Sequence, residues 1–258
     1  MRVSPPLAYA RSVVSVLELE WDHPLEYMLR DGKQPYDKPA TCISAQYNWA
    51  REHVLHNGYD ALLTVEADII VPPDALKRLV ACDADVAMGT YVFRRGKQEW
   101  NAYDVVEAGS GRSISETPER ARELWGQVVD VAGVGLGLAL ISRKALEIVG
   151  SFEPWVAADY DCDWTLSMRA QEHGLIQRAD LGLLCGHITQ TPSLRILWPD
   201  MGPLAMFRVE YLNDGWFNVT PDGNIEIVVS GFYSALITKQ QLARAVASEK
   251  YRKAVGEN

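Results

Sequence analysis

Short apolar runs with the length of buried strands alternate with helical segments between residues 41 and 190. The run 61–65 (ALLTV) is followed by two prolines, which suit the first turn of a helix, and the next apolar run is 85–93. A further strand is expected at 181–188 (LGLLCGHI). Strands that alternate with helices are typical of α/β proteins with a parallel sheet. We therefore expect an α/β sandwich with a mostly parallel central sheet flanked by helices.

Two long helices are predicted by their periodicity and by the glycines that follow them. The segment 41–58 places apolar residues on one helical face and ends at Gly58, and the segment 159–174 ends at Gly174. Residues 94–127 are polar, with glycine, serine and proline, and are expected to form a mobile excursion from the sheet.

Composition excludes several classes of protein. The net charge of −9 argues against a broad nucleic-acid-binding surface. No apolar run approaches the roughly 18 residues of a membrane span, so none is expected. The 4 cysteines form no C-x-x-C pair, which favours reduced thiols and a cytoplasmic location over a structural zinc site.

An acidic pair, Glu66 and Asp68, follows the strand at 61–65 directly. Residues two apart in an extended segment point to the same side, and open α/β sheets bind ligands at the carboxyl ends of their strands. Two carboxylates there suit Mn²⁺ or Mg²⁺, which in turn can hold a diphosphate. The alternative is a pair of solvated residues in an ordinary turn, which is the commoner explanation for so short a motif.

The acidic pair lies in a longer stretch, GYDALLTVEADIIVPPDALKRLV, that resembles the strand, Asp-x-Asp motif and helix of GT-A glycosyltransferases, especially family 2-like enzymes. Three later blocks resemble the same family in the same order: GVGLGLALISRKALEIVGSFEP, DYDCDWTLSMRAQEHG and LLCGHI. The resemblance implies a GT-A (Rossmann-like) fold. It also implies that residues 1–190 form the nucleotide-sugar-binding and catalytic domain. Residues 191–258 would be a C-terminal extension packed on that domain.

The resemblance assigns a metal site to Asp68 and His187. Glu66 stands where the family more often has aspartate, and it would bind the metal or the donor's ribose. Without the flanking block, His187 would be an ordinary core or surface histidine. A mixed oxygen and imidazole site favours Mn²⁺ over Mg²⁺.

The resemblance also places the catalytic base in the block 159–174. Asp161 matches the family's base best, and Asp163 is the second choice. Both would equally suit a helix N-terminus, where the macrodipole favours carboxylates. Trp155 is the expected acceptor-binding residue, because an aromatic face can stack on a sugar.

Further donor contacts are expected from Tyr9, Asp31, Arg51 and Gly135. Arg51 could pair with a phosphate or lie on an ordinary solvated helix face. Gly135 could let the backbone approach the donor sugar or simply permit close packing within a strand.

The expected function is metal-dependent transfer of a hexose from a nucleoside-diphosphate sugar, of the UDP or GDP type, to a hydroxyl acceptor. The acceptor would be a saccharide or a small molecule. One alternative is a protein of related architecture that binds a saccharide or nucleotide without turnover. A sugar nucleotidylyltransferase is less favoured, because residues 1–15 lack the glycine-rich triphosphate loop of that class.

Overall fold

A computed structural model defines most of the chain. It describes residues 11–12, 15–27, 39–93, 98–107, 110–153, 162–189, 195–201, 207–211, 215–219 and 225–229. Within these ranges no helix is long and apolar enough to cross a membrane.

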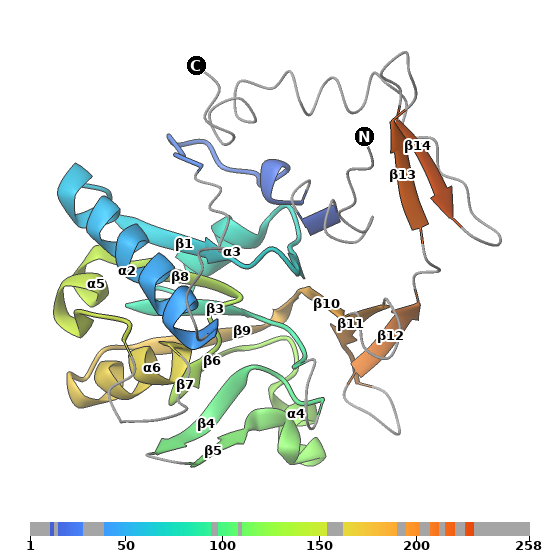
Figure 1. The fold of residues 1–258 in the computed structure, drawn as a ribbon. Coiled ribbons are helices and arrows are strands. Elements are labelled where there is room, and N and C mark those ends of the chain that lie inside the picture. Colours follow the sequence, from blue (N-terminus) through green and yellow to red (C-terminus); the bar gives the residue numbers. More distant parts are fainter. Residues whose placement is uncertain are drawn as a thin grey trace.

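A five-stranded sheet forms the centre of the molecule (Figure 1). Its strands, in spatial order, are β1 (Ala61–Val65), β8 (Leu138–Ser142), β3 (Val86–Thr90), β9 (Gln177–Leu184) and β6 (Val128–Asp130). β8 pairs antiparallel with both of its neighbours, β3 and β9 are parallel, and β6 closes the sheet antiparallel to β9.

The prediction of a mostly parallel, GT-A (Rossmann-like) sheet is wrong. Among the described strands only β3 and β9 form a parallel pair, and the other sheets are antiparallel throughout. The reason is the position of β8, which enters between β1 and β3 and runs opposite to both. β1, β3 and β9 still share one direction, but no two of them except β3 and β9 are hydrogen-bonded neighbours.

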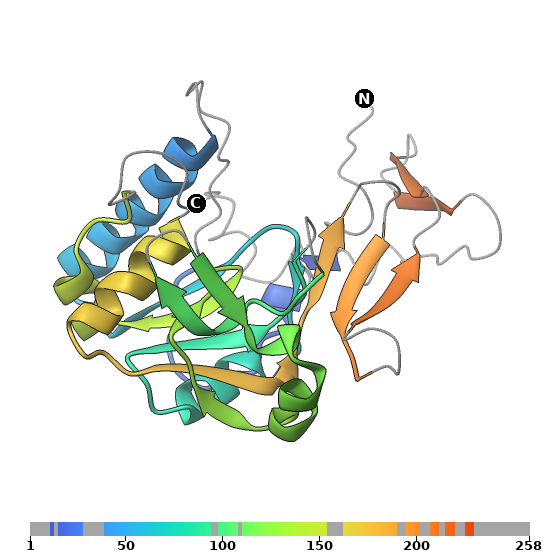
Figure 2. The same cartoon turned by 90° about the horizontal axis from the view of Figure 1, so that it is seen from below.

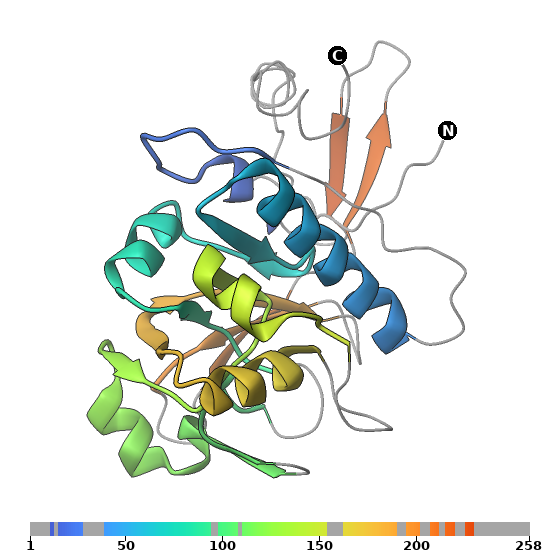
Figure 3. The same cartoon turned by 90° about the vertical axis from the view of Figure 1, so that its left-hand side faces the viewer.

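Helices cover both faces of this sheet. α2 (Pro39–Asn57), α5 (Arg143–Val149) and α6 (Cys162–Glu172) lie side by side on one face, and α3 (Ala75–Ala81) lies on the other (Figures 1 and 3). The predicted ends of the two long helices are confirmed, because Gly58 follows α2 directly and Gly174 lies two residues after α6, with positive φ of 75° and 64°. Alternation along β3 matches the two faces: Val86 and Met88 pack with α2, α5 and α6, and Ala87 packs with α3.

The segment 94–127, expected to be a mobile excursion, contains regular structure wherever it is described. β4 (Ala102–Glu107) and β5 (Ser110–Ser113) form an antiparallel pair, and a 3₁₀ turn (Ile114–Glu116) and α4 (Pro118–Leu124) follow. Together with β7 (Gly133–Val134), β4 and β5 form a small sheet that contacts α6.

A four-stranded antiparallel sheet lies beside the central one (Figure 2). Its order is β12 (Phe207–Tyr211), β11 (Arg195–Pro199), β10 (Gly186–Thr189) and β2 (Ile69–Ile70). β10 continues directly from β9, so one extended stretch of chain belongs to both sheets. β13 (Gly215–Val219) and β14 (Ile225–Val229) form a separate pair.

A bulge marks the point at which β9 leaves the central sheet. Gly89 pairs with Asp180, but the next residue, Thr90, pairs with Leu184. The Asp180 carboxylate organises the intervening loop. It accepts bonds from the backbone N–H groups of Gly182 (2.9 Å) and Leu183 (3.1 Å) and two bonds of 2.7 Å from the Arg78 guanidinium.

Candidate metal and donor site

The acidic pair forms a tight turn between β1 and β2. The Glu66 N–H donates to the Gly137 carbonyl (2.9 Å), and the Ile69 N–H donates back to the Glu66 carbonyl (2.9 Å). The Asp68 carbonyl accepts from the Ile188 N–H of β10 at 2.8 Å. The turn is therefore fixed by backbone bonds on both sides, and Asp68 is brought against the strand that carries His187.

Asp68 and His187 face each other in the interior. Their side chains come within 3.7 Å, from Asp68 Oδ2 to His187 Nε2, and the two residues are only 8 % and 5 % exposed. Pairing of β2 with β10 places His187 opposite Ile69, one residue from Asp68. The structure thus brings together the two residues expected to be metal ligands.

The two ring nitrogens of His187 have different surroundings. Nδ1 lies 2.6 Å from the Val92 carbonyl, which can only accept, so Nδ1 carries the proton. In the neutral ring Nε2 is then an acceptor, and it has no hydrogen-bond partner within the described part of the chain. A buried nitrogen lone pair and a carboxylate oxygen, both acceptors, therefore point toward one another.

A divalent cation fits this arrangement. Bonds from such an ion to nitrogen and oxygen are about 2.1 Å long, so two ligands at 90–120° lie about 3.0–3.6 Å apart, close to the observed separation. Across the described ranges, no group of three or more histidine, cysteine or carboxylate side chains could hold a metal. The protein would supply two ligands and leave the other positions to water or phosphate oxygens, as in many nucleotide-metal sites.

Glu66 belongs to a different part of the site. Its Oε1 lies 3.3 Å from the hydroxyl of Tyr47 on α2. Glu66 is partly exposed, and the Tyr47 ring packs against the core.

The glycines of residues 133–137 are explained first by packing. A Cβ on Gly135 would lie 2.3 Å from the Tyr91 hydroxyl, and one on Gly137 would lie 2.7 Å from the same ring. The Tyr91 hydroxyl accepts from the Gly137 N–H (3.0 Å), and the Tyr91 ring meets the edge of His187 at 5.3 Å between centroids. Tyr91 therefore links the glycine segment to the candidate metal ligand, and donor binding by Gly135 stays a prediction.

Asp163 lies near the same two tyrosines. The pKa values of Tyr47 and Tyr91 are raised well above the ordinary value, first by burial, then by the negative charge of Glu66, with a further contribution from Asp163. Asp163 is partly exposed in the first turn of α6, and its Oδ1 accepts from the Trp164 N–H at 2.9 Å. It therefore combines a helix N-terminal position with an electrostatic effect on both tyrosines.

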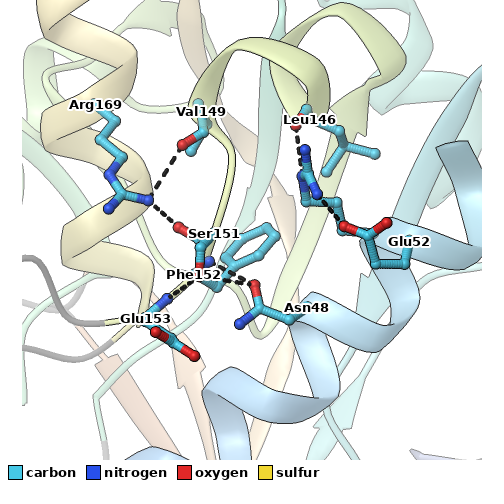
Figure 4. A network of polar contacts seen from close by, with 9 residues as sticks. Asn48, Glu52, Leu146, Val149, Ser151, Phe152, Glu153 and Arg169 are labelled. Atoms are coloured by element: carbon cyan, nitrogen blue, oxygen red, sulfur yellow. Dashed lines mark hydrogen bonds and ion pairs between the residues drawn. The ribbon is translucent and has the colours of Figure 1, made fainter.

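Arg51 lies apart from this group. Its Nε donates to the Leu146 carbonyl of α5 (2.7 Å), and a second nitrogen pairs with Glu52 (Figure 4). In this position Arg51 connects α2 to α5 through a side-chain hydrogen bond. The other expected site residues, Tyr9, Asp31, Trp155 and Asp161, lie outside the described residues.

Two residues of this site, Tyr47 and Tyr91, were not singled out from the sequence. Tyr47 lies at helical spacing from Val54 and Tyr91 lies within the apolar run 85–93, and both patterns are typical of core residues. No local signal distinguishes them, because their importance comes from contacts with Glu66 and His187 on distant segments.

Comparisons with known proteins add little. No model of a known protein family matches this chain. No curated protein matches it. Among solved structures, the crystal structure of A197 from STIV is similar at 17 % identity, over 76 % of this chain and 80 % of that one, with a TM-score of 0.37. A similarity this distant carries no argument about fold or function.

Proposed function

We propose that the protein is a metal-dependent glycosyltransferase that moves a hexose from a nucleoside-diphosphate sugar to a hydroxyl acceptor. The observation that carries the proposal is the buried His187 Nε2, which lies 3.7 Å from Asp68 Oδ2 and has no hydrogen-bond partner in the described part of the chain. The proposal rests on this site and on the sequence blocks around it, and does not depend on the strand directions of the sheet.

Asp68 and His187 would hold Mn²⁺ or Mg²⁺. The ion would supply positive charge for a diphosphate leaving group, which an acidic protein of net charge −9 otherwise lacks. The backbone bonds of the acidic turn and the hydrogen bond from His187 Nδ1 to the Val92 carbonyl would orient Asp68 and His187 before the ion or a nucleotide binds.

Transfer to a hydroxyl also requires a group that accepts its proton. Asp163 suits this role because it is partly exposed and its negative charge acts on Tyr47 and Tyr91. Asp161, two residues earlier in the sequence, remains the other candidate. A donor of the UDP or GDP type and a saccharide or small-molecule acceptor are the proposed partners.

Thermal unfolding with UDP, GDP or ADP, each with Mn²⁺, Mg²⁺ or EDTA, tests the proposal. A nucleotide at one hundred times its Kd adds about 2.7 kcal/mol, which corresponds to roughly 5–10 °C for a chain of this size. We expect a shift that requires metal and disappears in Asp68→Asn and His187→Gln. Asp104→Asn is the matched control, because this carboxylate pairs with Arg112 on the β4–β5 hairpin.

Turnover separates the enzyme from a binding protein. Release of free nucleoside diphosphate from the corresponding nucleotide sugar, dependent on metal and acceptor, is expected for the enzyme. A metal-dependent shift without release under any acceptor would identify a binding protein instead. No shift with any nucleotide and metal would refute the proposed site.

A further inference from the structure

We propose that Tyr47 is a positioning residue that orients the Glu66 carboxylate for donor binding, separately from the ion held by Asp68 and His187. This inference rests on the proposed function and adds a residue from α2 to it. The Tyr47 hydroxyl lies 3.3 Å from Glu66 Oε1 and 3.4 Å from the Leu136 carbonyl.

The Leu136 carbonyl also accepts from Thr64 Oγ1 at 2.8 Å. A carboxylate is the stronger acceptor because of its charge, so Glu66 is the favoured acceptor for the Tyr47 hydroxyl.

The Tyr47 ring contacts the loop after α5, whose polar contacts with α2 and α6 are shown in Figure 4. The Tyr47 ring packs against Phe152 with centroids 5.4 Å apart, and the neighbouring Asn48 Oδ1 accepts from the Phe152 N–H at 2.7 Å. On the other side of that loop, Arg169 of α6 donates to the carbonyls of Val149 (3.2 Å) and Ser151. The loop after α5 is thus bound to α2 on one side and to α6 on the other, and the Tyr47 ring packs against this loop.

Glu66 is consequently held at two points. Its backbone N–H is bound to Gly137, and its carboxylate lies beside Tyr47. A carboxylate oriented in this way presents its remaining acceptor capacity to a hydroxyl group of the donor. The ion and the Glu66 carboxylate would then contact different parts of one ligand.

Tyr47→Phe tests this inference, because it removes the hydroxyl and keeps the ring against Phe152. Two affinities are measured: that of Mn²⁺ alone, by electron paramagnetic resonance, and that of the nucleoside diphosphate in Mn²⁺, by calorimetry. The probe is whichever of UDP, GDP or ADP stabilises the wild type. We expect the nucleotide Kd to rise roughly tenfold and the Mn²⁺ Kd to stay within about twofold. Tyr59→Phe is the matched control, because the Tyr59 ring stacks on His53 away from Glu66.

A double-mutant cycle with Glu66→Ala shows whether Tyr47 acts through Glu66. In the Glu66→Ala background, Tyr47→Phe should change the nucleotide Kd by less than about twofold. An equal loss in both backgrounds would mean that Tyr47 supports the fold alone, and an unchanged Kd in the single variant would equally overturn the inference. Absence of nucleotide binding by the wild type would instead refute the proposed function, and this inference with it.

Discussion

Replacing Asp180 by asparagine should weaken the fold substantially. Asp180 is 3 % exposed, and its carboxylate accepts hydrogen bonds from N–H donors: the Arg78 guanidinium and the backbone of Gly182 and Leu183. Asparagine keeps the shape but turns an NH₂ group toward one of those donors. Removing one partner of a buried ion pair costs about 3–5 kcal/mol; since the Arg78 side chain is 35 % exposed and can be rehydrated, we expect about 3 kcal/mol.

The assay is equilibrium unfolding in urea, extrapolated to water. The loss corresponds to a fall in Tm of roughly 6–12 °C. The control is Asp130→Asn. Asp130 pairs with Arg178, which lies on β9 like Asp180, but the Asp130 side chain is 80 % exposed. It should cost less than about 1 kcal/mol. Equal losses in the two variants would refute the argument that burial and donor-only surroundings make Asp180 important.

Two further predictions concern the pH dependence of stability and the glycine segment. Burial raises the pKa of Glu210, but hydrogen bonds from Arg11 and Trp198 outweigh this effect and lower the pKa. The ionised Glu210 therefore stabilises the fold above the ordinary glutamate pKa, and this stabilisation is lost as pH falls through the lowered pKa. Free energies of unfolding between about pH 5 and pH 3 should therefore fall more steeply for the wild type than for Glu210→Gln, and parallel curves would contradict this. Gly135→Ala should destabilise by about 1–3 kcal/mol, because the new Cβ meets the Tyr91 hydroxyl at 2.3 Å; an unchanged urea midpoint would show that Tyr91 can move aside.

The sequence predicted the presence of elements better than their directions. The run 61–65 is β1, the segment 159–174 contains α6, and the segment 41–58 covers α2 except for its first two residues. Strand direction could not be obtained in this way, because an apolar run has the same pattern whichever way it is inserted. The prediction for the polar segment 94–127 was also inaccurate, because β4 is a partly exposed strand that includes charged residues and β5 (SGRS) has no apolar residue.

The candidate site was partly predictable for a related reason. Asp68 and His187 belong to recognisable blocks, so the sequence could pair them before their 3.7 Å separation was known. Arg51 was placed with the donor because its charge suited a phosphate, but charge gives no information about which helix face meets α5. Tyr47 escaped notice because only the folded chain brings its hydroxyl to Glu66.

The two-strand ladder between β2 and β10 has a consequence for how such a protein can diversify. The spacing of Asp68 and His187 depends on the pairs Ile70–Gly186 and Ile69–His187 and on the bond from Ile188 to the Asp68 carbonyl. β11 pairs with the other edge of β10, with Leu197 opposite His187, and supports the same register. Sequence changes beyond β11 can therefore alter the outer part of this sheet while the two side chains keep their separation.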